Sequence, residues 1–303
     1  MKTEPQIPET DSAWIPAGLS EAAVAILGIG LMGGSLAMAL KGKTAALYGI
    51  DPDEAVCLQA QKLDLFDRVA SQADDLLPSA NFIVLCAPLG SLPSLIRSLP
   101  GLHPGHAVVM DIGSTKSGIL PLLEELPARF APLGGHPMCG REVNSLANAS
   151  SDLYEGGSFA LLPLKRTPQG ALGLALQLVK AVGAHPAWIN PLQHDRWVAS
   201  ISHLPYLVAN CLAAVTPLDA APLVGPGFKS TTRLAVESIE MMNHILMNNR
   251  ENVLPVMKNY RLRLEQMEKA LEKGDFDLLD RLFKEGAAQR AALMDVFQEG
   301  SGS

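Results

Sequence analysis

The sequence has few cysteines, and none of them are spaced for a metal site or a disulfide. The four are Cys57, Cys86, Cys139 and Cys211, with no C-x-x-C pair among them. Structural zinc sites and small disulfide-linked domains need closely spaced cysteines, so the sequence predicts neither. Thiols that stay reduced are typical of cytosolic proteins. We therefore expect a cytoplasmic protein with no metal ligands.

Basic runs and long apolar runs are also missing. A net charge of −7 and a pI near 5.5 leave no basic surface for nucleic acid. Residues 1–20 lack the basic start and apolar stretch of a signal peptide, and we expect them to be a flexible extension. The nearest approach to a membrane span, residues 204–225, is interrupted by Asn210, Asp219 and three prolines. The sequence therefore predicts neither a nucleic-acid partner nor a membrane.

Two patterns of hydrophobic residues divide the remaining chain. In residues 21–190, short β-leaning apolar runs alternate with helical patterns, which is typical of a doubly wound, mainly parallel α/β sheet. Seven such runs are candidate strands: AVAILGIG, AALYGID, NFIVLCAPL, HAVVMDIGS, RFAPLGG, SFALLPL and PAWIN. Residues 191–303 show helical periods only. We predict a Rossmann-type domain followed by an all-helical domain.

The run AVAILGIGLMGGSLAMAL holds a G-x-G-x-x-G motif at Gly28, Gly30 and Gly33, between a strand and a helix. In dinucleotide sites the first glycine makes the turn, the second admits a pyrophosphate, and the third lets the helix pack closely. Asp51 ends the second strand, where a carboxylate binds a ribose 2′-hydroxyl and repels a 2′-phosphate. The alternative is an incidental glycine turn with a surface aspartate. We predict an NAD site that also includes Leu31 and Met32.

Two further strand ends are expected at the same edge of the sheet. The strand in NFIVLCAPL ends at Ala87 and Pro88, which we place beside the cofactor. The strand in VVMDIGSTKSG delivers Ser114 and Lys116, whose hydroxyl and ammonium groups suit an anionic substrate that bears a hydroxyl. A turn with a serine cap and a solvated lysine explains this second pattern equally well.

The stretch GGHPMCGRE places His136 between glycines and a proline. These residues predict an irregular loop after a strand, at the carboxyl edge of the sheet. A neutral imidazole accepts a proton near pH 7, and hydride removal from a carbinol carbon needs a base for the hydroxyl proton. A histidine that only holds its own loop together is the alternative. For a base we expect activity to rise near the reference pKa of about 6.5.

The helical half contains two polar motifs. In QHDRWVASISHLPYLVA, Pro205 should kink the helix. His203 could therefore have a structural role instead of a functional one. A helix-capping role suits His194 and Asp195 equally well. In GPGFKSTTRLA, Arg233 follows a Gly-Pro-Gly turn. Arginine is suited to bidentate capture of a carboxylate, although solvated surface arginines are common.

Taken together and in order, GIGLMGGSLA, DIGSTK, GGHPMCGRE, HDRWVASISHLPYL and GFKSTTRLA resemble the prephenate/arogenate dehydrogenases of tyrosine biosynthesis. The resemblance implies a Rossmann-type domain, a helical domain that forms a homodimer, and NAD as cofactor. It implies oxidative decarboxylation of prephenate or arogenate, with His136 as base, Ser114 on the same hydroxyl and Arg233 on a carboxylate. It implies that Tyr206 lies near the substrate, and we also predict substrate contacts for Lys116, Ser202 and His203.

The sequence departs from the family at one position. S-H-L-P is commonly followed by a second histidine, and here Tyr206 stands there. A phenol carries no positive charge at neutral pH, which bears on substrate choice. The alternatives are a dehydrogenase for a modified prephenate or another β-hydroxy acid, and a non-catalytic NAD-sensing protein. For β-hydroxy acids, the lysine and asparagine pair expected of such enzymes has no convincing match around Lys229.

Overall fold

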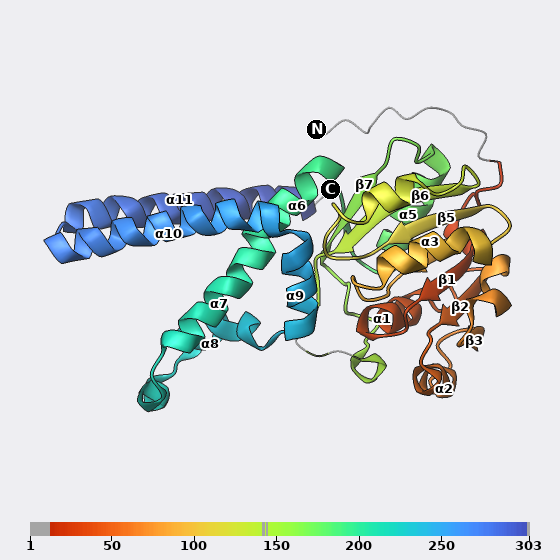
Figure 1. Cartoon of the computed structure of the whole chain (residues 1–303), viewed down its shortest axis with the longest axis horizontal. Helices are drawn as coiled ribbons and strands as arrows, with labels where there is room; N and C mark the ends of the chain where they lie inside the picture. Colours follow the sequence, from red (N-terminus) through yellow and green to blue (C-terminus); the bar gives the residue numbers. More distant parts are fainter. Residues whose placement is uncertain (1–12, 141–142, 144, 302–303) are drawn as a thin grey trace.

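The structure, a computed structural model, describes residues 13–140, 143 and 145–301 (Figure 1). Its N-terminal part is an eight-stranded sheet in the order β3-β2-β1-β4-β5-β6-β7-β8. The strands are β1 (Ala23–Leu27), β2 (Ala46–Ile50), β3 (Arg68–Ala70), β4 (Phe82–Leu85), β5 (Ala107–Asp111), β6 (Phe130–Pro137), β7 (Ser158–Pro163) and β8 (His185–Trp188). Strands β1 to β6 are parallel, while β7 runs antiparallel to β6. The doubly wound α/β class is confirmed.

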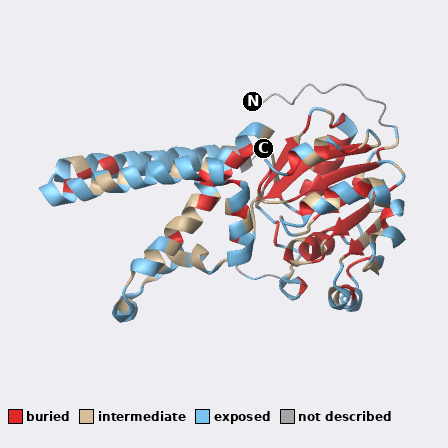
Figure 2. Cartoon of the chain, viewed as in Figure 1, coloured by how far each residue is buried: buried red, intermediate tan, exposed pale blue. Residues whose placement is uncertain are grey.

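The central strands are apolar throughout because helices cover both faces of the sheet. Successive residues of β1 enter different cores: Val24 and Ile26 pack on one side, Ala25 and Leu27 on the other. The first core also receives α1 (Leu31–Leu40), α2 (Glu54–Lys62) and α5 (Gln169–Ala181). The second receives α3 (Leu92–Leu102) and α4 (Leu120–Glu124). The sheet is accordingly the most buried part of the chain (Figure 2).

Two details of this half differ from the sequence prediction. Strand β3 is missing from the predicted set because three residues at the exposed edge of a sheet show no periodicity. Residues 13–20 were expected in a flexible extension, yet Ile15 and Leu19 are buried, and the Leu19 N–H donates to Gln177 Oε1 (2.9 Å). Residues 1–12 of that extension lie outside the described residues.

Short 3₁₀ turns connect several of these elements. They are η1 (Leu19–Glu21), η2 (Ala73–Asp75), η3 (Leu77–Ser79) and η4 (Leu146–Asn148).

The chain is helical from Pro191 onward. It forms α6 (Pro191–Val198), the π-helical turn η5 (Ala199–His203), α7 (Leu204–Val215), η6 (Leu218–Leu223), α8 (Pro226–Thr232), η7 (Arg233–Val236), α9 (Ile239–Asn248), α10 (Arg250–Lys273) and α11 (Phe276–Ser301). Helices α10 and α11 make a long hairpin that projects away from the sheet, and its surface is mostly exposed (Figures 1 and 2). Gly274, at φ 65°, closes α10 in the left-handed conformation.

Pro205 disturbs the helix in a specific way. The Leu204 N–H donates to the carbonyl of Ala199, five residues back, so one extra residue is accommodated in the turn η5. Proline lacks an N–H, and its ring crowds the carbonyl four residues earlier in a regular helix. The π-helical turn before Pro205 relieves that conflict and joins α6 to α7 without a break in the helical rod.

Candidate active site

The glycine turn after β1 has the close contacts that a dinucleotide site needs. Gly28 has φ 98°, and a Cβ there would lie 2.8 Å from the backbone nitrogen of Ala87. A Cβ on Gly33 would lie 1.9 Å from the carbonyl oxygen of Gly28, so α1 could not approach the turn with any side chain at this position. A Cβ on Gly30 meets nothing within 4 Å. The backbone at Gly30 is therefore open on this side, which leaves room for a ligand to approach it.

Asp51 is tied to the same turn. The N–H of Ile29 donates to its Oδ2 (2.7 Å), and the N–H of Asp53 donates to its Oδ1 (3.0 Å). The carboxylate therefore stands at the carboxyl end of β2, beside the glycine turn. Asp53 caps α2 by accepting from the N–H of Ala55 (2.8 Å). These contacts agree with a ribose-binding carboxylate at Asp51, a role that stays a prediction.

The loop after β4 meets the helical half of the chain. Ala87 lies against Gly28, and the Pro88 carbonyl accepts from the N–H of Ser91 (2.8 Å), which makes a turn. A Cβ on Gly90 would lie 2.9 Å from Cε1 of His244 on α9. The loop that we place beside the cofactor is therefore also a place where the two halves of the chain meet.

Lys116 is not the solvated lysine that the sequence offered as an alternative, and its contact with the substrate stays a prediction. Its side chain has no exposed surface, and its ammonium forms an ion pair with the buried carboxylate of Asp111 at the end of β5. Burial lowers the pKa of Lys116 and raises that of Asp111, and their mutual attraction opposes both shifts. Ser114 lies between them in the chain and is half-buried.

His136 lies in a strand, which corrects the expectation of an irregular loop. It belongs to β6 and pairs with Ala160 of β7. The neighbouring glycines serve packing: a Cβ on Gly135 would lie 3.0 Å from the Asp111 carbonyl oxygen and from the Phe159 ring. The expected position at the carboxyl end of the parallel strands is nevertheless found. Arg141 and Glu142 of the same motif lie outside the described residues.

A histidine from α6 meets His136. Nε2 of His194 lies 2.9 Å from Nδ1 of His136, and Nδ1 of His194 lies 2.7 Å from Oδ1 of Asp195. All three side chains are buried, with His136 8% exposed. The sequence had offered the His194–Asp195 pair as a helix cap, and its contact with His136 was missed. Adjacent polar residues inside the apolar run 191–215 were the available signal.

Asp195 also holds the loop that follows Ser114. Its carboxylate accepts from the backbone N–H groups of Lys116 (2.9 Å) and Ser117 (2.8 Å). Its backbone carbonyl accepts from Asn249 Nδ2 (2.7 Å) at the start of α10. Burial alone would raise the pKa of Asp195, but the hydrogen bonds from His194, Ser117 and Lys116 outweigh it and hold the pKa well below the usual range. Asp195 is therefore an anion.

His136 and His203 are neutral. Burial, followed by the charges of His194, Lys116 and His203, holds the pKa of His136 well below 6.5, against a smaller opposing effect of Asp195. Burial lowers the pKa of His203 to about 4. Asn249 Nδ2 lies 3.1 Å from His203 Nδ1, so this ring nitrogen contacts protein. A structural role for His203 is thereby supported, and its substrate contact stays a prediction.

The remaining predicted substrate residues lie on the helical half. Ser202 and Tyr206 are half-buried on η5 and α7, and Arg233 is exposed at the start of η7, which packs on α7. Their approach to His136 stays a prediction.

Comparison with known proteins decides the family. Residues 36–187 match the nucleotide-binding domain of prephenate dehydrogenase, and residues 190–285 match its dimerization domain. The chain belongs to the prephenate dehydrogenase family. It is therefore an oxidoreductase, as the motif resemblance implied.

Relatives of the family agree along most of the chain. Prephenate dehydrogenase of Bacillus subtilis is 29% identical over 89% of this chain and 76% of its own length. Cyclohexadienyl dehydrogenase of Zymomonas mobilis is 26% identical over 89% and 95%. The structure of Aquifex aeolicus prephenate dehydrogenase with hydroxyphenyl propionate and NAD⁺ has a TM-score of 0.81 at 28% identity, covering 91% of this chain and 99% of that one.

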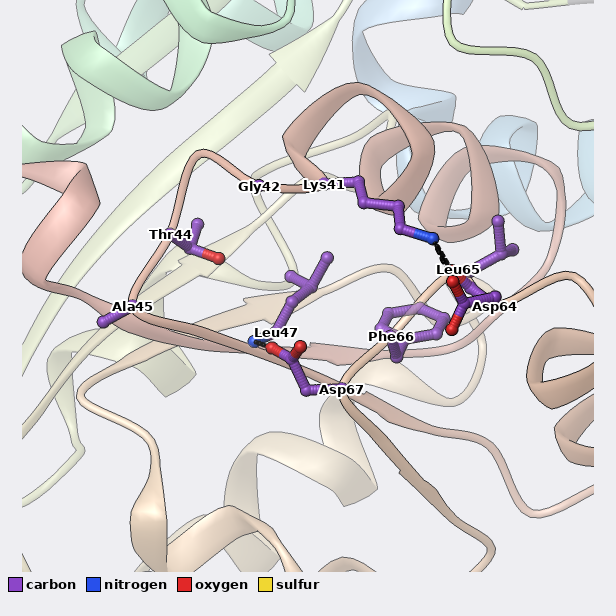
Figure 3. Close-up of a pocket in the computed structure, with 9 residues that line it drawn as sticks. All are labelled: Lys41, Gly42, Thr44, Ala45, Leu47, Asp64, Leu65, Phe66 and Asp67. Carbon is purple, nitrogen blue, oxygen red and sulfur yellow. Dashed lines mark hydrogen bonds and ion pairs between the residues drawn. The ribbon is translucent and has the colours of Figure 1, made fainter.

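A cavity elsewhere in the sheet half lies away from this family site. The cavity in Figure 3, about 340 Å³, lies at the amino end of β2, whereas Asp51 follows its carboxyl end. There Lys41 pairs with Asp64 (2.6 Å), and Asp67 accepts from the N–H of Leu47. Among the described residues no group of three metal-binding side chains occurs. One described helical stretch, residues 191–215, is long and apolar enough to cross a membrane. A single such helix is weak evidence for a membrane span, and this one contains His194 and His203.

Proposed function

We propose that this enzyme catalyses NAD⁺-dependent oxidative decarboxylation of a prephenate-type cyclohexadienol, with His136 as the base. The product is 4-hydroxyphenylpyruvate from prephenate, or tyrosine from arogenate. The observation that carries the proposal is the neutral imidazole of His136, which His194 holds at the same edge of the sheet as the glycine turn. The open backbone at Gly30 and the carboxylate of Asp51 fit NAD⁺, and the family match supports this cofactor.

The chemistry divides between cofactor and protein. NAD⁺, when bound, accepts the hydride from the ring carbon that bears the hydroxyl. His136 takes the hydroxyl proton while Ser114 hydrogen-bonds the same oxygen, and Arg233 binds a substrate carboxylate. The ring carboxylate leaves as CO₂, its bonding electrons make the ring aromatic, and the phenolate oxygen regains a proton. His136 therefore has to hold a proton only between these two events.

The substrate is tested by an assay that follows the absorbance of reduced nicotinamide. We expect turnover with NAD⁺ and either prephenate or arogenate, and much slower turnover with NADP⁺ because Asp51 repels a 2′-phosphate. Inactivity with both acids, in a protein that binds NAD⁺, would favour a modified prephenate or the non-catalytic sensor instead.

Tyr206 should influence the choice between the two acids. The acids differ in the side chain, where prephenate has a keto group and arogenate has an ammonium. Replacing Tyr206 with histidine adds a group that gains positive charge at low pH, so we expect it to favour prephenate, with a change of about tenfold in the ratio of kcat/KM values. Tyr206→Phe removes only the hydroxyl and is the matched control. An unchanged ratio in Tyr206→His would show that position 206 does not select the substrate.

We also propose that the enzyme is a homodimer through its helical half. Large apolar side chains are exposed there, including Val215 (77%), Leu218 (93%) and Leu223 (89%), and residues 190–285 match a dimerization domain. Sedimentation should give twice the chain mass of 32.2 kDa. Glutamate at both Val215 and Leu218 should yield monomers, whereas Leu58→Glu on α2 should not. A monomeric wild type would contradict the proposal. A cytoplasmic location stays a prediction.

A further inference from the structure

We propose that the His194–Asp195 pair of α6 is a positioning device that fixes the protons of His136, so that Nε2 of His136 is always the basic nitrogen. This inference rests on the proposed role of His136 as the base. It assigns functions to two residues that lie in the other half of the chain: His194 acts through His136, and Asp195 acts through His194 and the loop after Ser114.

The hydrogen bonds of Asp195 fix its charge. Its two oxygens accept from the backbone N–H groups of Lys116 and Ser117, which can only donate. A carboxylate in this position needs no proton of its own, and the helical half gives it His194 as a further partner at 2.7 Å. Nδ1 of His194 must therefore carry the proton and donate it to Asp195.

The proton on Nδ1 of His194 in turn determines where the proton of His136 lies. A neutral His194 with its proton on Nδ1 has a lone pair on Nε2. This lone pair faces Nδ1 of His136 at 2.9 Å, so Nδ1 of His136 donates to it. Neutral His136 then carries its only proton on Nδ1. Its Nε2 is left with a free lone pair, which is the state a general base requires.

The same pair stabilises the proton that His136 acquires during the reaction. Protonated His136 is an imidazolium that donates to His194, whose other nitrogen is bonded to the anion Asp195. Other groups near it disfavour positive charge: His194 itself when it is protonated, then the ammonium of Lys116, and His203 when it is protonated. Asp111 partly neutralises Lys116. Asp195 is the anion that connects to His136 through hydrogen bonds, so the pair offsets part of the cost of a buried imidazolium.

The arrangement has a geometric consequence as well. Asp195 bonds the backbone just after Ser114, while its neighbour His194 bonds the base. Two adjacent residues of one helix therefore set the position of both predicted catalytic groups. Asn249, which donates to the carbonyl of Asp195, holds that helix in place (2.7 Å).

The test compares His194→Leu and His194→Gln in the wild type and in the His136→Asn background. Leucine removes the acceptor of the Nδ1 proton, and we expect kcat to fall about a hundredfold with KM for NAD⁺ unchanged. Glutamine keeps an acceptor oxygen near the position of Nε2, and we expect it to recover about tenfold of that loss. In the His136→Asn background both replacements should have no further effect, because His194 acts through His136. His185→Gln on β8 is the control for loss of a histidine elsewhere.

Each outcome bears on one assignment. A fall in kcat of equal size in both backgrounds, or of less than about tenfold in the wild type, would overturn the positioning role. Turnover by His136→Asn at the wild-type rate would instead show that the base of the proposed function is wrong. If the leucine variant does not fold, ¹⁵N spectra of the histidines in the unmodified enzyme decide: a proton on Nδ1 of His136 supports the proposal, and a proton on Nε2 overturns it.

Discussion

Replacing His136 with asparagine lowers kcat by about 10³-fold and leaves the dissociation constant for NAD⁺ within about twofold of the wild type. The asparagine is too short to reach the same substrate oxygen and cannot accept a proton at neutral pH. The glycine turn and Asp51, which we assign to the cofactor, lie in the first two strand–loop units and keep their own contacts. The measurements are steady-state rates with the preferred acid and titration of protein fluorescence with NAD⁺. Strongly impaired NAD⁺ binding would contradict the assigned role.

The pH profile gives the same residue a second, independent test. The sequence suggested a rise near pH 6.5, but the pKa of His136 is held well below that value by burial and by His194 and Lys116. The base is active when unprotonated, so kcat/KM should rise with pH below 6.5 and be flat above it. Folding must be checked at each pH, because unfolded chains protonate His203 below about pH 6.5 and the folded state does so only near 4. Stability therefore falls as pH decreases through that window. A rise centred at or above 6.5 would argue against a buried base.

Replacing Gly33 with alanine costs about 3 kcal/mol of folding free energy and abolishes NAD⁺ binding. The added Cβ would lie 1.9 Å from the carbonyl oxygen of Gly28, which is backbone and cannot rotate away. Helix α1 must shift from the turn, and the site for the pyrophosphate is lost. Chemical denaturation of the enzyme without cofactor measures the first effect, and fluorescence titration the second.

Gly30 is the matched control for that prediction. Alanine at Gly30 meets no protein atom within 4 Å, so stability without cofactor should change by less than about 0.5 kcal/mol. NAD⁺ binding should nevertheless weaken by about tenfold or more, because the methyl group occupies the space where the pyrophosphate approaches. Equal destabilisation by the two substitutions would mean that the turn does not pack as described.

The fold was largely predictable because its signals are local. Buried parallel strands need continuous apolar runs, so seven strands could be found in order. The glycine motif could be found because a tight turn between a strand and a closely packed helix needs glycines. Strand β3 could not, since an exposed strand of three residues obeys neither pattern. His136 was placed correctly at the sheet edge but wrongly in a loop. The neighbouring Gly135 packs closely against Asp111 and Phe159, and the hydrophobic periodicity of the sequence does not reveal such packing.

The site was predictable only in part because its key contacts join distant parts of the chain. His136 and His194 are 58 residues apart, and Lys116 and Asp195 are 79 apart. A sequence shows which polar residues are present, but not which of them share a proton. For the same reason Lys116 could be assigned to the substrate or to solvent, whereas burial beside Asp111 makes it an internal ion pair.

The π-helical turn before Pro205 changes the rotation of α7 about the helix axis relative to α6. Each residue of an α-helix advances the side chains by about 100°. The extra residue in Ala199–His203 therefore rotates α7 relative to α6. Before the turn, His194 contacts β6 and Asp195 contacts the loop after Ser114, and after the turn the apolar helix α7 is mostly half-buried. Deleting one residue between 199 and 203 would remove this phase shift, so insertions and deletions here should be far less tolerated than in the loop at η6.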